Sequence, residues 1–221
     1  MSYLLRIQLP DEPGALGYVA AALGEVEGDI RSVDVVDYGA NGVVVDDIVV
    51  DLPMGLLPDT LITAAQSISG VEVDSIRPFS GSVDRRGQIA LLAKFSQHTK
   101  NLDRALGDVV DGLPQTMTAG WAIVLGEQSD GRWVRRASST AAPEDNGRTL
   151  PEAPIDSPRN LDPDEETWLP EDWTVMDSSI AATPMGKGLV LVIGRPGGPD
   201  FLPSEVEHLG RIGTIVGAII D

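Results

Sequence analysis

The sequence contains no cysteine, and only two of its 221 residues are histidines. Without cysteine, disulfide bonds, thiol catalysis and thiolate metal ligands are excluded. His98 and His208 lie in different predicted helices and lack the spacing of a zinc site, so both are interpreted as ordinary surface residues. The sequence therefore predicts no catalytic centre, no metal site and no cofactor, and we expect a protein that is not an enzyme.

Basic residues are also scarce, with 16 Lys and Arg against 34 Asp and Glu, a formal net charge of −18 and a pI near 4.3. Such a surface repels phosphate backbones and anionic headgroups, which argues against a nucleic-acid or membrane-surface partner. No uncharged run reaches the roughly 18–20 residues of a membrane span, and the first residues lack the pattern of a secretion signal. We therefore expect a cytoplasmic protein.

Apolar residues are plentiful: 42% of the chain is hydrophobic and the mean hydropathy is +0.01. This composition supports packed cores, and a chain of this length is predicted to form two small domains.

The first 80 residues show a repeated change of hydrophobic period. Alternating or β-branched runs at 4–9, 30–36, 43–52 and 71–76 predict strands, and helical spacing at 15–26 and 60–69 predicts two helices. Asn41-Gly42 is a strong hairpin signal. The order β-α-β-β-α-β predicts an α+β domain of the ferredoxin-like type over residues 1–79, with a link at 80–84 inside the Pro, Gly and Ser-containing stretch 77–84.

The second predicted domain covers residues 85–221. Helices are expected at 89–96 and 102–110, the latter closed by Pro114, and a hairpin is expected from strands 121–125 and 133–137. Residues 174–182 read as a strand, and 189–194 form the most apolar strand, which should be central. A capping box of Ser204 and Glu207 opens the last predicted helix.

Residues 141–173 form a long acidic, proline-rich segment, with ten carboxylates, six prolines and two arginines. Such a composition buries a core with difficulty. We interpret the segment as a loop that is either mobile or held on the surface by anchors such as Trp168, Leu169 and Trp173, and we favour mobility.

Other polar clusters have simple explanations. Alternation along the strand sends Asp46 and Asp47 to opposite faces, which argues against a shared proton or metal, and we expect a solvent-facing carboxylate. The four carboxylates in 162–166 lack the spacing of a calcium loop. Gly186-Lys187-Gly188 lacks the frame of a phosphate loop and is interpreted as a turn.

One loop has a more specific pattern. The segment Asp11-Glu12-Pro13-Gly14-Ala15-Leu16 between the first strand and helix, followed by Gly28-Asp29-Ile30, resembles an ACT domain, the amino-acid-sensing module of metabolic enzymes, over residues 3–79. Gly14 lets the backbone approach a ligand closely, and the start of the helix suits a carboxylate.

The resemblance implies a free amino acid bound where two copies meet. It implies that Asp11 accepts hydrogen bonds from the ligand ammonium and that Asp29 comes from the partner subunit. ACT pockets often have Asn where this chain has Asp, which allows a cationic or otherwise altered ligand. The implied site residues are Leu9, Asp11, Pro13, Gly14, Ala15, Leu16, Asp29 and Ile30. Alternatively, these aspartates are only turn and cap residues.

The second half is similar to a GAF domain in residues 184–220, where Phe201-Leu202-Pro203-Ser204-Glu205 precedes the last helix. The resemblance implies an antiparallel sheet with flanking helices. The acidic segment stands where such a domain has the helices that cover its pocket.

Together these patterns predict a regulatory sensor: at least a dimer, binding a free amino acid through its first domain and signalling through its second domain to a partner protein. The alternative is a scaffold for protein–protein association without a small-molecule ligand.

Overall fold

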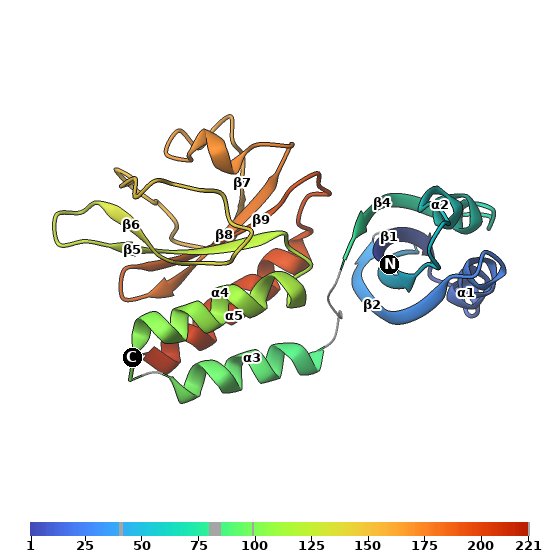
Figure 1. Ribbon diagram of the computed structural model, residues 1–221, viewed down its shortest axis with the longest axis horizontal. Helices are drawn as coiled ribbons and strands as arrows, with labels where there is room; N and C mark the ends of the chain where they lie inside the picture. Colours follow the sequence, from blue (N-terminus) through green and yellow to red (C-terminus); the bar gives the residue numbers. More distant parts are fainter. Residues whose placement is uncertain (40–41, 80–84, 99, 221) are drawn as a thin grey trace. The chain divides into compact units, whose positions relative to one another are not determined.

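The computed structural model describes residues 1–39, 42–79, 85–98 and 100–220 (Figure 1). The chain divides into two compact units, Met1–Asp84 and Arg85–Asp221. The predicted link at 80–84 and Asn41 of the predicted hairpin lie outside the described residues. Within the described part of the chain, no helix combines the length and the apolar character needed to cross a membrane.

The first unit has the predicted order of elements. In chain order they are β1 (Ser2–Pro10), α1 (Ala15–Glu25), β2 (Asp29–Gly39), β3 (Val43–Asp51), α2 (Asp59–Gln66) and β4 (Glu72–Pro78). The strands form one antiparallel sheet in the order β2-β3-β1-β4. The strand β4 extends through Pro78, so the first residues of the stretch 77–84 belong to the sheet.

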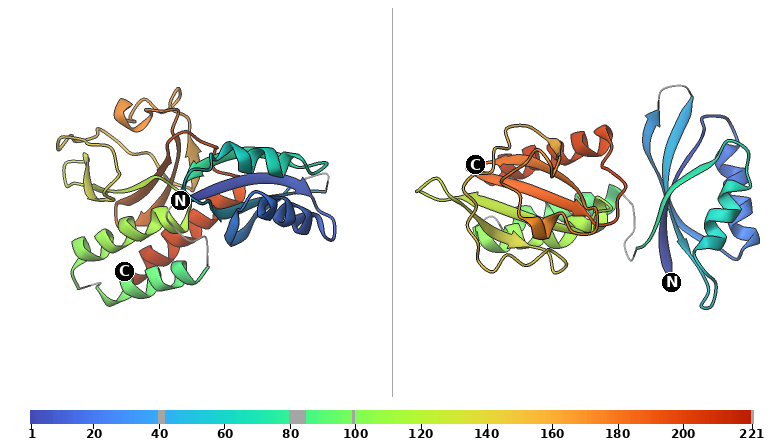
Figure 2. Two further views of the ribbon diagram at one scale, coloured as in Figure 1. Left: turned by 45° about the vertical axis from the view of Figure 1, so that its right-hand side comes forward. Right: turned by 90° about the horizontal axis from the view of Figure 1, so that it is seen from above.

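Alternation along the strands decides which side chains face the helices. On β1, Leu5, Ile7 and Leu9 are buried and join the core beneath α1 and α2, which lie on the same face of the sheet (Figure 2). Arg6 points to the other face, where its guanidinium forms two hydrogen bonds of 2.7 and 2.8 Å with the Asp47 carboxylate. The register pairs Arg6 with Asp47 and Ile7 with Asp46, so the two aspartates lie on opposite faces as predicted.

The second unit is a five-stranded antiparallel sheet with three long helices. Its elements are α3 (Arg85–Gln97), α4 (Leu102–Thr116), β5 (Trp121–Glu127), β6 (Trp133–Ser138), β7 (Arg159–Leu161), η1 (Glu171–Trp173), β8 (Ser179–Gly186), β9 (Leu189–Arg195) and α5 (Pro203–Ile220). The strand order is β6-β5-β9-β8-β7, so the apolar strand β9 is central, as predicted. The fold is thus α+β, built from antiparallel sheets and helices.

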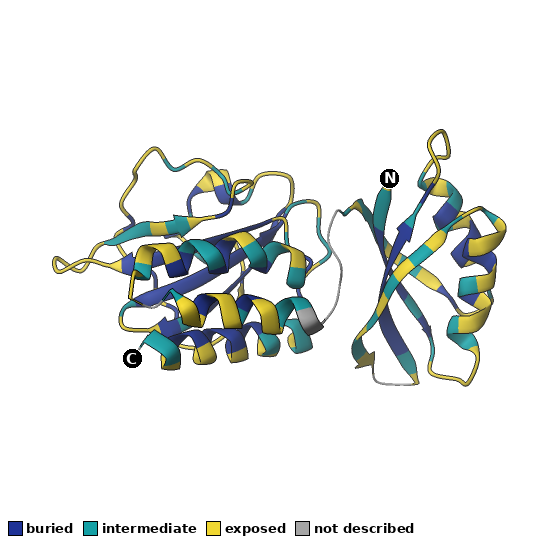
Figure 3. Cartoon of the chain, turned by 60° about the horizontal axis from the view of Figure 1, so that its bottom comes forward, coloured by how far each residue is buried: buried dark blue, intermediate teal, exposed yellow. Residues whose placement is uncertain are grey.

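Both faces of this sheet are covered, which explains why its central strands are buried (Figure 3). Ala122 and Val124 face a core shared with α3, α4 and α5, whereas Trp121, Ile123 and Leu125 face a second core. The second core is completed by the segment 141–173, which lies on the face opposite the helices (Figure 1).

The expectation that the acidic segment is mobile is wrong. Trp168 is 5% exposed and Trp173 2%, and their rings contact each other, with Trp173 also against Trp121. Glu166 binds the Arg159 guanidinium and accepts a hydrogen bond of 2.5 Å from the Trp168 indole. The two contacts lower the pKa of Glu166, that with Arg159 most. A few apolar anchors and paired charges thus order a segment whose average composition is typical of a loop.

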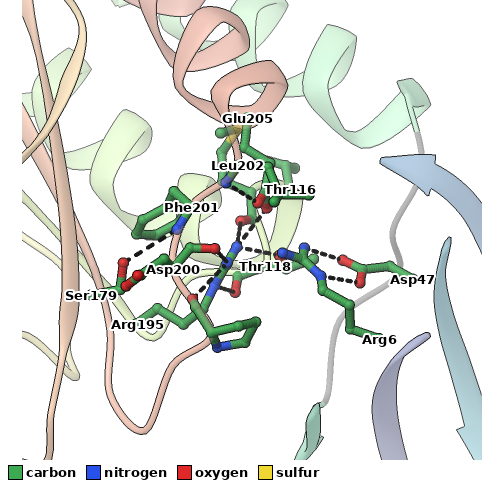
Figure 4. A network of polar contacts seen from close by, with 12 residues as sticks. Arg6, Asp47, Thr116, Thr118, Ser179, Arg195, Asp200, Phe201, Leu202 and Glu205 are labelled. Carbon is green, nitrogen blue, oxygen red and sulfur yellow. Dashed lines mark hydrogen bonds and ion pairs between the residues drawn. The ribbon is translucent and has the colours of Figure 1, made fainter. Parts of the chain in front are cut away.

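A buried arginine organises the start of α5 (Figure 4). The Arg195 guanidinium lies 4.0 Å from the centre of the Phe201 ring and donates to the Glu205 carboxylate at 2.7 Å. It also donates to the Thr118 carbonyl and hydroxyl oxygens at 3.1 and 2.9 Å. Phe201 and Glu205 of the GAF-like pattern therefore hold Arg195, and through it the preceding strand, against α5.

The predicted capping box is displaced by two residues. Glu205, not Glu207, caps the helix, because its carboxylate accepts a hydrogen bond of 2.9 Å from the Leu202 amide. The Ser204 hydroxyl is buried and has no hydrogen-bond partner within the described chain. The ion pair with Arg195 fixes the position of the Glu205 carboxylate. Glu205 rather than Glu207 therefore caps the helix.

Two other predicted boundaries are wrong. Pro114 lies inside α4, which continues to Thr116, and the Met117 amide still donates to the Leu113 carbonyl at 2.9 Å. Residues 174–178 are not a strand, since β8 begins at Ser179, where pairing with β9 starts.

Candidate functional site

The loop between β1 and α1 has the conformation that the sequence pattern requires. Gly14 caps α1 with φ +94°, a left-handed backbone conformation that residues other than glycine rarely adopt. The Asp11 amide donates to the Gly42 carbonyl at 2.9 Å, which anchors the loop to the β2–β3 connection. The first turn of α1 therefore follows directly from a fixed loop.

A pocket of about 230 Å³ lies beside this loop. One wall comes from the loop and α1, and the other from the connection between α2 and β4. At the turn Ser69-Gly70, a side chain on Gly70 would approach the Pro10 ring to 2.9 Å, so glycine lets the two walls meet. The lining residues are Pro10, Glu12, Pro13, Ala15, Tyr18, Ile68, Ser69 and Val71.

Only two of the predicted site residues, Pro13 and Ala15, line the pocket. Asp11 and Gly14 are exposed in the loop beside it. Leu9 is buried in the core beneath the helices, and Leu16 packs at the border of that core. These apolar residues position the loop, and Gly14 sets the start of the helix.

Asp29 and Ile30 lie far from the loop within one copy of the chain. Asp29 is paired with Asp51, which is in turn paired with Ser2, at the end of β1 opposite Pro10. Eight residues of strand at about 3.3 Å each separate these two ends. Ile30 packs on the core and Asp29 is exposed near Arg31, so neither belongs to the pocket beside Gly14 within one copy.

Sequence reasoning missed the second wall of the pocket, formed by Ile68, Ser69 and Val71. The available signal was Gly70, which ends the predicted helix: its φ of +80° and its contact with Pro10 mark a turn packed against the loop. Tyr18, 66% exposed and one helical turn after Gly14, was a second signal.

The burial of Asp46 differs most from the sequence prediction. One of the two aspartates, Asp46 or Asp47, is expected to face solvent, but both are buried, 2% and 1% exposed. Asp46 lies on the helix-covered face, and its Oδ1 atom has no hydrogen-bond partner in the described chain. Burial, followed by the charges of Asp47 and Asp34, raises the pKa of Asp46 to about 6. The prediction failed because alternation assigns the two carboxylates to opposite faces but does not show that both faces are covered at this position.

Metal ligands do not gather anywhere in the described residues: there is no group of three or more His, Asp or Glu side chains suited to an ion. His98 is half-buried rather than a free surface residue. Its Nδ1 atom lies 2.5 Å from the Asp108 carboxylate, which also binds the Lys94 ammonium at 2.6 Å. This cluster ties α3 to α4.

The face of the second sheet opposite the helices is filled by the chain itself. Trp168 and Trp173 pack there against Trp121 and other apolar side chains of the sheet. A ligand on this face would have to displace the segment 141–173.

No family model matches the sequence, and no curated protein matches it. Solved structures do resemble it. The GAF domain of an Acinetobacter phosphoenolpyruvate-protein phosphotransferase is 18% identical, with a TM-score of 0.48 over 62% of this chain and 94% of that one. Its counterpart from Coxiella burnetii is 18% identical, with a TM-score of 0.46 over 61% and 93%. A phycoerythrobilin-bound GAF domain from a cyanobacterial phytochrome is 15% identical, with a TM-score of 0.46 over 60% and 93%.

Each of these three matches covers about three fifths of this chain.

Proposed function

We propose that the protein is a non-enzymatic regulatory sensor. Its first unit is a ferredoxin-like domain of the ACT type that binds a free amino acid beside the β1–α1 loop. Its second unit is a GAF-like domain that passes the change to a partner protein.

The observation that carries this proposal is the pocket of about 230 Å³ beside Gly14. The first turn of α1 has amide groups without partners inside the helix, which suits the ligand carboxylate. Glu12 lines the pocket and Asp11 lies next to it, both as acceptors for the ligand ammonium. An α-amino acid carries both complementary charges.

The edge strand β2 supports a dimer. Its outer edge has no strand partner in the described sheet, and it exposes the apolar side chains of Val33, Val35 and Tyr38 by 37%, 40% and 71%. Edge strands of this kind invite pairing with a second copy. Antiparallel pairing through β2 would place the partner's Asp29 beside the Gly39 end of this strand, the end from which the Gly42 connection to the β1–α1 loop begins.

The test is a thermal-shift screen of the twenty amino acids, combined with light scattering. A ligand at about 100 times its dissociation constant stabilises the folded state by roughly 2.7 kcal/mol. We expect one amino acid or a small group to raise the melting temperature, and we expect at least a dimer. The absence of any shift, together with a monomeric mass, would contradict the proposal.

A second function is favoured by the filled face of the second unit. Because Trp168 and Trp173 occupy the sheet there, that unit is suited to act as a scaffold for protein–protein association. The distinguishing result would be partner binding that is unchanged by any amino acid.

A further inference from the structure

A larger groove lies elsewhere in the first unit, between α1 and α2. Its volume is about 410 Å³, within the range of small-molecule sites. Apolar side chains are prominent in its lining, and two carboxylates complete it. The lining residues are Ala22, Glu25, Val26, Leu57, Asp59, Thr60, Thr63, Ala64 and Ser67.

The three hydroxyl groups that line this groove already donate hydrogen bonds to backbone carbonyls. Thr60 donates to the Leu57 carbonyl at 2.7 Å, Thr63 to the Asp59 carbonyl at 3.0 Å, and Ser67 to the Ala64 carbonyl at 2.6 Å. Each hydroxyl has a single proton, so what remains toward the groove is an oxygen lone pair. These side chains therefore accept hydrogen bonds from a ligand and do not donate them.

The backbone amides at the start of α2 also donate hydrogen bonds within the chain. The amide of Thr60 bonds to the Leu57 carbonyl at 3.1 Å, and that of Leu61 to the Pro58 carbonyl at 2.9 Å. An anion at this end of α2 would therefore find these two amides already donating to backbone carbonyls, and it would lie beside the Asp59 carboxylate. The usual attraction of a helix start for anions is offset at this site.

The charge around the groove has one sign. Glu25 and Asp59 are exposed on it, and its lining includes no Lys, Arg or His. The groove also runs beside the last turn of α1, a negative dipole end that has no basic residue of its own. Residues 1–84 contain fourteen Asp and Glu against three Arg, a formal charge of −11. The field of the whole unit thus adds to the local preference for a cation.

We propose that this groove binds a small organic ammonium ion with an apolar body. The apolar part packs on Ala22, Val26, Leu57 and Ala64, and the ammonium group donates to the carboxylates and hydroxyl oxygens. A neutral analogue leaves these acceptors without donors, and an anionic analogue is repelled. The site is separate from the pocket beside Gly14, and the proposal does not depend on the amino-acid sensor.

The test uses 2-phenylethylammonium as the probe, titrated into the ¹⁵N-labelled full chain and followed by NMR. We expect saturable shifts centred on the amides of Ala22, Val26, Thr63 and Ala64. We expect 2-phenylethanol to bind at least about tenfold more weakly, and 3-phenylpropionate to cause no shifts at these amides.

Two variants locate the site. The double substitution Glu25→Gln and Asp59→Asn should weaken probe binding by about tenfold, because it removes both carboxylate charges from the rim. Thr63→Phe should abolish binding by filling the groove from an exposed position. The matched control, Glu72→Gln, removes an exposed carboxylate from β4 and should leave the affinity unchanged.

Equal shifts from the three probes would overturn the proposal, as would shifts confined to the Tyr18 and Val71 pocket. The same holds if no shifts occur up to about 20 mM, beyond the range of even weak sites. A preserved spectrum for each variant shows that it has folded.

Discussion

The two units differ in how completely the faces of their sheets are covered. In the second unit both faces are covered by the unit's own chain, and Trp168 and Trp173 complete the second core. In the first unit, two grooves remain beside the helices, and the edge strand β2 exposes apolar residues. The first unit thus keeps open grooves beside its helices, whereas the second unit fills both faces of its sheet with its own side chains.

The sequence makes this comparison easy to test. All four tryptophans belong to the second unit, and all three tyrosines belong to the first. Tryptophan fluorescence therefore follows unfolding of the second unit alone.

The largest effect is expected from Trp173→Ala. Trp173 is 2% exposed and contacts both Trp121 and Trp168, so its removal leaves a cavity under the segment 141–173. We expect the unfolding free energy of the second unit to fall by about 3–5 kcal/mol, measured by denaturant titration with fluorescence. The control, Val175→Ala, alters an exposed side chain and should change stability by less than about 0.5 kcal/mol. A small effect of Trp173→Ala would mean that the segment is only loosely held.

A stabilising effect is expected from Asp46→Asn in the first unit. The folded state holds Asp46 with a pKa of about 6, above its ordinary value, so burying the charged form is unfavourable at pH 7.5. The shift of about two pKa units corresponds to roughly 3 kcal/mol. Because asparagine keeps a buried polar group, we expect a gain of about 1–3 kcal/mol at pH 7.5, measured by amide hydrogen exchange in the first unit.

The pH dependence gives the sharper check. As the pH falls from above 6 to about 4, wild-type Asp46 takes up a proton in the folded state but not in the unfolded state. Its unfavourable contribution disappears over that window, so the first unit becomes more stable as the pH falls. The Asn variant should lose this component, whereas Glu72→Gln, an exposed carboxylate, should retain it. An unchanged profile in the Asn variant would show that Asp46 is solvated.

A smaller effect is expected at the Asp108 cluster of the second unit. Hydrogen bonds from Lys94 and then His98 lower the pKa of Asp108, against the opposing effect of burial. A depressed pKa stabilises the fold above the ordinary value near 4 and stops doing so as the pH falls through the folded value. Asp108→Asn should cost about 0.5–1 kcal/mol at pH 7 and nothing in strong acid. Asp111→Asn, exposed on the same helix, should have no such effect in fluorescence-detected unfolding.

The sequence predicted the parts of the fold that depend on local periodicity. The alternation on β1 and the helical spacing of α1 gave both elements to within two residues of their observed ends. The predictions failed where long-range contacts decide. Arg195 selects Glu205 as the helix cap, and the Trp168 and Trp173 side chains order an acidic segment, neither of which is visible in a local window.

The candidate site was predictable only in part for the same reason. The pattern around Gly14 marked the loop, and the observed φ of +94° agrees with the need for glycine there. The opposite wall of the pocket comes from a turn more than fifty residues later in the chain. No sequence pattern within the loop predicts that contact.

The most direct test of the sensor proposal is calorimetry of amino-acid binding to the wild type and to Asp11→Ala, with Asp37→Ala as a control on β2. Loss of a charge-assisted hydrogen bond to the ligand ammonium should weaken binding by about 1.5–3 kcal/mol, roughly ten- to a hundredfold, and change stability much less. Glu12→Gln, inside the pocket, shows how the two carboxylates share the ammonium. If the wild type binds an amino acid and both loop variants bind it equally well, the loop is only a turn, and the central claim is wrong.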